Sequence, residues 1–176
     1  MTPEATGLSL DEQAYEMLHA AFQHARSGDA ASLAALIDRG VPVDVRNPNG
    51  DSLLMLASYH GHAHATRVLL ARGADPARPN DRGQTPLAGA AFKGDVDMAR
   101  LLLDHGAEVD GGGPDGKTAL MFAAMFDRAD VVTLLLERGA SASRRDASGT
   151  SARDLAHSMG AAGALARLDA HEGSGR

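Results

Sequence analysis

The sequence predicts an all-α solenoid, in which short helix pairs stack along one axis in units of 33 residues. Three series of residues carry this prediction, because each recurs at that interval along the 176-residue chain. They are Gly40, Gly73, Gly106 and Gly139; Gly50, Gly83, Gly116 and Gly149; and Gly28, Gly61, Gly94 and Gly160, with Asp127 in the one missing place. A fixed period of this length indicates repeated supersecondary units, each too small to bury an apolar face alone.

The composition fits one globular domain and excludes several classes of protein. The chain is 44% hydrophobic and 23% charged but only 3% aromatic, and it has no cysteine, which excludes disulfides, thiolate metal sites and a cysteine nucleophile. A net charge of −6 is the wrong sign for a general nucleic-acid binder. No apolar run approaches ~20 residues and the N-terminus lacks a signal pattern. We therefore expect a cytoplasmic protein with no nucleic-acid or membrane partner.

The first unit, residues 10–50, predicts two helices after a disordered tail at residues 1–9. Its first helix opens with Leu10-Asp-Glu-Gln and carries a buried stripe at helical spacing. The stripe residues are Leu18, Ala21 and Ala25, and those of the second helix are Leu33, Leu36 and Ile37.

The three middle units each predict a helix pair and span residues 51–83, 84–116 and 117–149. A hydroxyl residue precedes each first helix and can accept a backbone N–H bond; these residues are Ser52, Thr85 and Thr118, with Ser151 in the next unit. Leu87, Ala90 and Ala91 then show helical spacing. The second helix carries a leucine-rich face, such as residues 101–103, and ends at a glycine.

The last unit, residues 150–170, is expected to close the single domain that spans residues 10–170. Arg153 stands where the middle units have leucine, which a terminal unit can accept because no further unit covers it. Residues 171–176 are expected to be a second disordered tail.

The motif Thr85-Pro-Leu87, followed by Ala90-Ala91 and Gly94, matches the T-P-L-H-x-A opening of one known family. With the Leu-Leu-x-x-Gly-Ala closing pattern, the chain resembles an ankyrin-repeat protein of a small bacterial type, with about five repeats including its caps. The family's opening histidine is absent; its places hold Met55, Ala88, Met121 and Asp154. The resemblance implies a non-catalytic module that binds a partner protein on a concave face, formed by hairpin tips and the ends of the first helices.

Aligned by phase, eleven residues fall on this expected binding face. The helix-end residues are Tyr59, His60, Phe92, Lys93, Met125 and Phe126, and the loop residues are Asp81, Arg82, Gln84, Asp115 and Lys117. Three of the six aromatic residues of the chain are among them, and such side chains anchor interfaces. Including Asp51, the charges cancel, so we expect that bulk charge does not select the partner. The alternatives are burial of these residues by their neighbours and self-association; we expect a monomer.

Residues 111–118 match the phosphate-binding pattern G-x-x-x-x-G-K-[ST], which indicates an alternative function in nucleotide binding. That pattern requires a buried strand before the loop, and residues 107–110 are too short and too polar to supply one. Gly116 and Thr118 are also positions of the repeat. We therefore interpret the segment as a repeat hairpin.

Three closely spaced histidines, His60, His62 and His64, are a possible imidazole metal site. Gly61 is expected to turn the chain between the first two, which favours a structural role for His62. No other arrangement of side chains indicates catalysis, so we expect neither an enzyme nor a cofactor.

Overall fold

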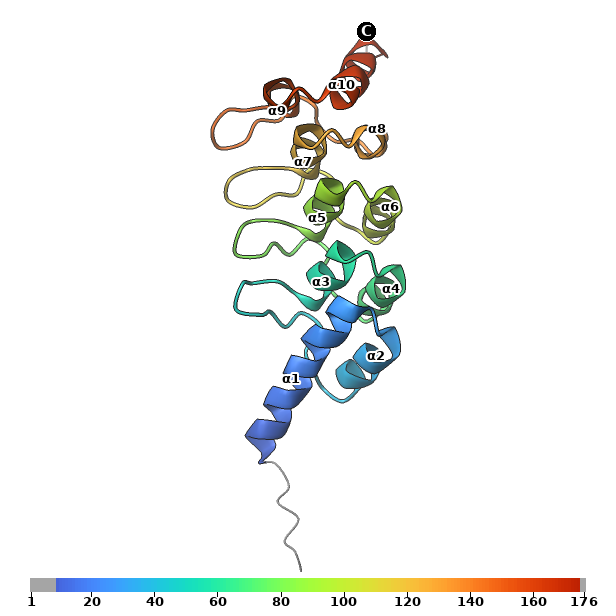
Figure 1. The fold of residues 1–176 in the computed structure, drawn as a ribbon, viewed down its shortest axis with the longest axis vertical. Helices are drawn as coiled ribbons and strands as arrows, with labels where there is room; N and C mark the ends of the chain where they lie inside the picture. The colour runs from blue at the N-terminus through green and yellow to red at the C-terminus, as the bar shows by residue number, and fades with distance from the viewer. Residues whose placement is uncertain (1–8, 175–176) are drawn as a thin grey trace, which may run out of the picture.

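The computed structural model describes residues 9–174, and within that range it confirms the predicted all-α repeat solenoid (Figure 1). The described residues form ten α-helices, with only isolated β-bridges in the loops. The helices are α1 (Leu10–Ser27), α2 (Ala30–Asp38), α3 (Leu53–Tyr59), α4 (Ala63–Ala71), α5 (Pro86–Lys93), α6 (Val96–Asp104), α7 (Ala119–Met125), α8 (Ala129–Glu137), α9 (Ala152–Met159) and α10 (Ala162–Ser174).

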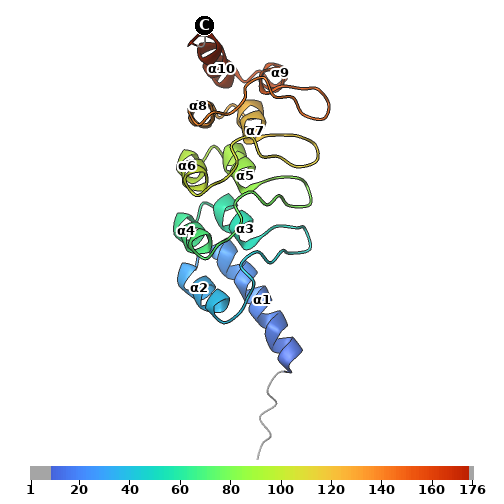
Figure 2. The ribbon, with the colours of Figure 1, turned by 180° about the vertical axis from the view of Figure 1, so that it is seen from behind.

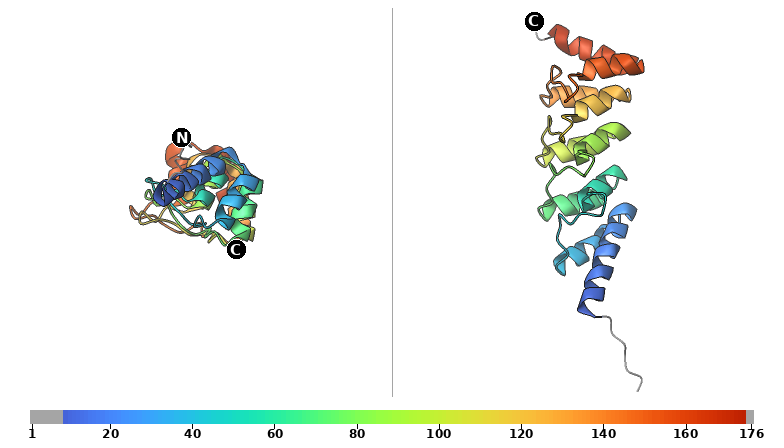
Figure 3. Two further views of the ribbon diagram at one scale, coloured as in Figure 1. Left: turned by 90° about the horizontal axis from the view of Figure 1, so that it is seen from below. Right: turned by 90° about the vertical axis from the view of Figure 1, so that its left-hand side faces the viewer.

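The helices form two columns, with the loops on one side. Helices α3, α5, α7 and α9 make the inner column, next to the loops, and α2, α4, α6 and α8 lie on the far side (Figures 1 and 2). Figure 3 shows the pairs as successive layers along the long axis. The loops therefore follow the inner column on the same side along the stack (Figures 1 and 2).

The predicted hydroxyl residues do begin the inner helices. Each hydroxyl oxygen accepts the backbone N–H of the residue three positions later, at 3.1 to 3.3 Å; the capping residues are Ser52, Thr85, Thr118 and Ser151. Asp127, the one exception in its glycine series, adopts a φ of 54°, and among the described residues it is the only non-glycine with positive φ. Its carboxylate accepts the backbone N–H of Ala164 in the last unit at 2.7 Å.

The core is a row of leucines and small residues repeated from unit to unit. Each outer helix buries one leucine at the same phase, and these are Leu36, Leu69, Leu102, Leu135 and Leu168. Alanines of the inner helices lie against them and let the layers approach closely. Arg153, at the position of a core leucine, pairs instead with the carboxylates of Asp169 and Glu172 on α10.

The expected tails need correction where the structure describes them. Helix α10 continues to Ser174, so residues 171–174 are helical, and Glu172 is held by Arg153 at 3.1 Å. Ser9 is the N-cap of α1 and forms a reciprocal capping box with Glu12. The other tail residues, 1–8 and 175–176, lie outside the described residues.

Polar links join the first two units; we call this boundary joint 1–2. Arg72 donates to both carboxylate oxygens of Asp38, at 3.0 and 3.1 Å. The Nε2 atom of His62 lies 2.7 Å from the Arg26 carbonyl oxygen. Two more links of this set of four are made by the backbone N–H groups of Asp75 and Asp81, which donate to Asp44 Oδ1 and to the Asn49 carbonyl. Outside this set, Arg46 pairs with Asp81 and Arg78 donates to the Asp44 carbonyl across the same boundary.

The same four links recur two units later, at joint 3–4. Arg138 pairs with Asp104 at 2.8 Å, and Arg128 Nε donates to the Phe92 carbonyl at 3.1 Å. The backbone N–H groups of Ser141 and Ala147 donate to the Asp110 carboxylate and to the Asp115 carbonyl.

Joint 2–3, between them, lacks these links. Within residues 9–174, no hydrogen bond or ion pair connects residues 51–83 to 84–116, apart from the hairpin bonds between Asn80 and Gln84. The two units meet instead through apolar and aromatic side chains and through a close loop contact. A Cβ at Gly113 would lie 2.2 Å from Gly83 Cα, so only glycine permits this approach.

No helix of the part that the structure describes has both the length and the apolar character needed to cross a membrane.

Candidate functional site

Three aromatic rings form a continuous row across the ends of the inner helices. Tyr59 and Phe92 lie in a stacked arrangement with ring centroids 6.4 Å apart. Phe92 and Phe126 make an edge contact, with centroids 4.6 Å apart and planes at 77°. The Lys93 ammonium lies 5.1 Å from the centre of the Tyr59 ring, within reach of a cation–π interaction. The structure thus brings together four of the residues that the 33-residue alignment predicts for the binding face.

None of the three rings is buried. Tyr59 is 37% exposed, and Phe92 and Phe126 are half-buried. The alternative that neighbouring side chains bury this row therefore does not hold. The row presents apolar area to solvent on the side where the loops stand.

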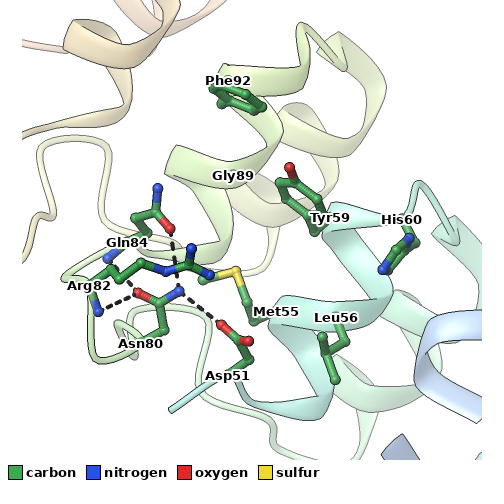
Figure 4. A pocket seen from close by; sticks show the side chains of 10 residues that line it. All are labelled: Asp51, Met55, Leu56, Tyr59, His60, Asn80, Arg82, Gln84, Gly89 and Phe92. Atoms are coloured by element: carbon green, nitrogen blue, oxygen red, sulfur yellow. Dashed lines mark hydrogen bonds between the residues drawn. The ribbon is translucent and has the colours of Figure 1, made fainter. Parts of the chain in front are cut away.

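A pocket of about 350 Å³ opens beside the row, between α3 and α5 (Figure 4). Its lining residues are Asp51, Met55, Leu56, Tyr59, His60, Asn80, Arg82, Gln84, Gly89 and Phe92. Five of the eleven predicted residues are among them, from both the helix-end set and the loop set. The pocket lies at joint 2–3.

Gly89 lines the pocket at a position where the other units carry a large side chain. The equivalent residues of the other units are Leu56, Phe122 and Leu155. A Cβ added at Gly89 would lie 3.4 Å from the Tyr59 ring and 3.7 Å from Met55 Sδ. A side chain at position 89 would therefore lie between Tyr59 and Met55 and would fill part of the pocket.

The loop edge of the pocket is held by an amide network. Asn80 Oδ1 accepts the backbone N–H groups of Arg82 and Gln84, both at 3.0 Å. The Asn80 amide donates to Asp51 Oδ1 at 2.8 Å, and Asn47 donates to Asp51 Oδ2 at 3.3 Å. Both oxygens of this buried carboxylate are thus occupied.

His60 lies at the opposite edge of the pocket, where its pKa is below the ordinary value. Partial burial is the main cause, and electrostatic interactions with His62, Lys93 and Arg26 add to it. The neutral imidazole is favoured, so His60 can donate or accept a hydrogen bond at neutral pH.

The remaining predicted residues lie outside the pocket. Asp81 pairs with Arg46 at 2.6 Å. Lys117 pairs with Asp115 at 3.1 Å and lies 3.9 Å from Asp146. Met125 is half-buried at the end of α7. These loop charges are used to hold neighbouring loops together.

Sequence reasoning missed four of the ten lining residues, Met55, Leu56, Asn80 and Gly89, and counted Asp51 only in the charge balance of the face. Met55 was noted only at the place of the missing opening histidine, and Leu56 and Gly89 carried no prediction. The signal for Gly89 was the phase comparison with Leu56 and Phe122, which isolates it as the one position without a side chain. Asn80 carried no comparable signal, because its role depends on the fold of the loop.

The segment 111–118 is a repeat hairpin in the structure, as interpreted. No extended strand precedes it among the described residues, and Gly112 forms a β-bridge with Thr118. The Thr118 hydroxyl is buried and caps α7, and Lys117 lies between two carboxylates. The parts that would hold a phosphate and Mg²⁺ are thus engaged in the fold.

The three histidines do not converge. The rings of His60 and His62 lie parallel, 6.2 Å apart, and His62 is bonded to the Arg26 carbonyl, while His64 is exposed on α4. In the described part of the chain, no group of three or more histidine, cysteine or carboxylate side chains could hold a metal ion.

Comparisons with known proteins agree with this architecture. The sequence matches the family described as ankyrin repeats, in three copies, over residues 17–112 and again over residues 73–146. It is also similar to a protein of Pseudomonas aeruginosa that is described as an ankyrin repeat protein, with 52% identity over 59 residues. That stretch is 34% of this chain and 34% of the relative, so the chain spans about a third of the length of the curated relative that it matches.

Proposed function

This chain belongs to the ankyrin-repeat family, and we propose that it binds a partner protein on the concave face between its loops and inner helices. Ankyrin repeats generally mediate protein–protein interaction and are generally non-catalytic. The proposal goes further, because it assigns the binding to one face and to particular side chains.

The observation that carries the proposal is the row of Tyr59, Phe92 and Phe126. Aromatic residues are scarce in this chain, yet three of them meet in one partly exposed row next to a pocket. Partly exposed aromatic side chains beside a concavity are typical anchors of protein interfaces. The rings also hold one another in place, which lowers the entropy that they lose on binding.

Replacing the three rings together by alanine tests the proposal. We expect the Tyr59→Ala, Phe92→Ala, Phe126→Ala variant to keep its helical circular dichroism spectrum, because the leucine core is untouched. Capture of partners from the native cytoplasm should be lost, since truncating one buried anchor costs about 2 kcal/mol or more. Arg67→Ala and Arg100→Ala, on the outer helices, are the matched controls and should capture normally.

Two results would contradict this assignment. An unfolded triple variant would mean that the rings belong to the core. A folded variant that still captures every partner would place the binding surface elsewhere.

We also infer that the protein acts as a cytoplasmic monomer, without a nucleic-acid or membrane partner. The net charge of −6 supports the exclusion of nucleic acid. Analytical ultracentrifugation of the purified chain tests whether it is a monomer. Self-association that the triple variant abolishes would contradict the monomer and indicate a dimer formed through the aromatic row.

A further inference from the structure

We propose that the pocket between α3 and α5 receives an acidic peptide segment of the partner, with one apolar side chain inserted beside Gly89. This inference rests on the proposed function and names the chemistry of the partner at one place on the concave face. It follows from the lining of the pocket and from which charges around it remain unpaired.

The interior of the pocket selects an apolar side chain. Met55 and Leu56 contribute from α3, and the rings of Tyr59 and Phe92 stand on two neighbouring helices (Figure 4). Its volume of about 350 Å³ is at the low end of the ~300–1,000 Å³ of small-ligand pockets. A leucine or aromatic side chain placed there would occupy the space that the other units fill with their own Leu56, Phe122 or Leu155.

The charges around the pocket select carboxylates. The formal balance of the face is zero, but its acids are engaged within the protein. Asp51 accepts from two asparagines, and Asp81 and Asp115 are paired with Arg46 and Lys117.

Two cations at the pocket are left without a carboxylate. In the range 9–174, neither Arg82 nor Lys93 forms an ion pair. Both are exposed, Arg82 on the loop edge and Lys93 at the Tyr59 ring. Hydrogen bonds from neutral amides leave the Asp51 carboxylate charged, so Asp51 and Arg82 balance each other in the lining, and Lys93 beside the Tyr59 ring adds one positive charge. This excess supports a part for charge in selecting the partner.

The experiment uses short random peptides displayed on phage and the full chain as target. The enriched peptides are expected to share a leucine or aromatic residue with an aspartate or glutamate nearby. One enriched peptide is then synthesised with a fluorescent label, and its Kd is measured by polarisation at low and high salt.

Gly89→Leu is designed to fill the pocket while it leaves the fold intact. It places in α5 the side chain that Leu56 supplies one unit earlier, and leucine favours a helix more than glycine does. We expect the labelled peptide to bind at least about tenfold more weakly, the loss of a well-placed anchor. Gly89→Ala, with its Cβ at ordinary contact distance from the ring, is the second variant and should weaken binding less.

Arg82→Glu tests the charge. It should weaken binding by about fivefold at low salt, as expected of an exposed charge pair, and by less at high salt. Arg67→Glu, an exposed arginine on α4, makes the same change of charge away from the pocket and should leave the Kd unchanged.

Three outcomes would overturn the inference: no enrichment of acidic residues, binding that Gly89→Leu leaves intact, or an equal effect of Arg67→Glu. Peptides that the triple aromatic variant loses but Gly89→Leu retains would overturn the pocket and leave the concave face standing. Peptides that both variants retain would overturn both proposals.

Discussion

Joint 2–3 differs from the joints on either side in how the units are held together. Joints 1–2 and 3–4 each have four polar links in the same register. Joint 2–3 has the same leucine and alanine interior but none of the four among the described residues. The apolar core residues therefore repeat every 33 residues at each of these joints, whereas the polar links between units do not.

Each missing link has an identifiable cause in the sequence. Ala71 and His105 stand where the other joints have aspartate and arginine, and Ala77 replaces the carboxylate that binds a backbone N–H. Asp95 caps its own helix by accepting from the backbone of Met98, so it does not reach the preceding unit. Pro114 has no N–H to donate.

The joint without polar links is also the joint with the pocket. Gly89 removes packing on the concave side at the place where bonds are missing on the other sides. The chain thus consists of two linked groups, units 1 and 2 and units 3 to 5, that meet at a softer boundary. Stability in a stack of repeats is a sum of unit and interface terms, so this boundary is where local opening should begin.

The largest expected effect comes from opening a cavity beside the soft joint. Leu102→Ala should cost about 2–5 kcal/mol and should split urea unfolding into two steps, with units 3 to 5 unfolding first. Leu168→Ala should cost clearly less, although both leucines are fully buried, because the last unit has a neighbour on one side only. Equal costs, or one cooperative step in both variants, would argue against weak coupling at joint 2–3.

A smaller effect is expected from installing one of the missing links. Ala71→Asp together with His105→Arg copies the pair of Arg72 and Asp38 into joint 2–3. Because both positions are exposed, the new pair should raise the free energy of unfolding by about 0.2–1 kcal/mol. Urea unfolding of the double variant and of each single variant isolates the coupling. If the change in unfolding free energy of the double variant equals the sum of the changes in the single variants, the two side chains do not interact. An ion pair would then not strengthen this joint.

The smallest effect is expected from acid, which should make joint 1–2 resemble joint 2–3. The pKa of Asp38 is below its ordinary value of 3.8, chiefly because Arg72 donates a hydrogen bond to the carboxylate. Its contribution to stability is therefore complete above that ordinary value, and it is lost as the pH falls through the lower pKa of the folded state.

Hydrogen exchange in units 1 and 2 checks this effect. The protection factors, which compare each amide with its intrinsic exchange rate at the same pH, should fall below the ordinary pKa of Asp38 in the wild type, and Asp38→Asn should flatten that part of the pH dependence. An identical pH profile in the two proteins would mean that the pair does not stabilise the joint.

The fold was predictable because its signals are local and periodic. Glycines at a fixed interval, hydroxyl residues at the helix starts and one leucine per outer helix are all visible in a single chain. The C-terminal boundary was not, because α10 is extended by ion pairs that Arg153 makes across the last unit. Such pairs depend on side-chain positions in space.

The candidate site was predictable only in outline. Phase alignment placed Tyr59, Phe92 and Phe126 on one face, and the structure brings their rings into contact. It gave no sign that Asp115 and Lys117 are paired with each other. Nor could it show that Asp51 is saturated by two amides. Which charges remain free is a property of the folded loops.

Asp127 shows what an averaged repeat sequence would lose. A consensus of the five units would place glycine at this position and would relieve the left-handed backbone there. It would also remove the carboxylate that receives the Ala164 N–H, next to Gly163, where a side chain would crowd that carboxylate at 3.0 Å. The residue that departs from the consensus thus ties α10 to the preceding unit, as the pair of Arg145 and Asp154 ties α9.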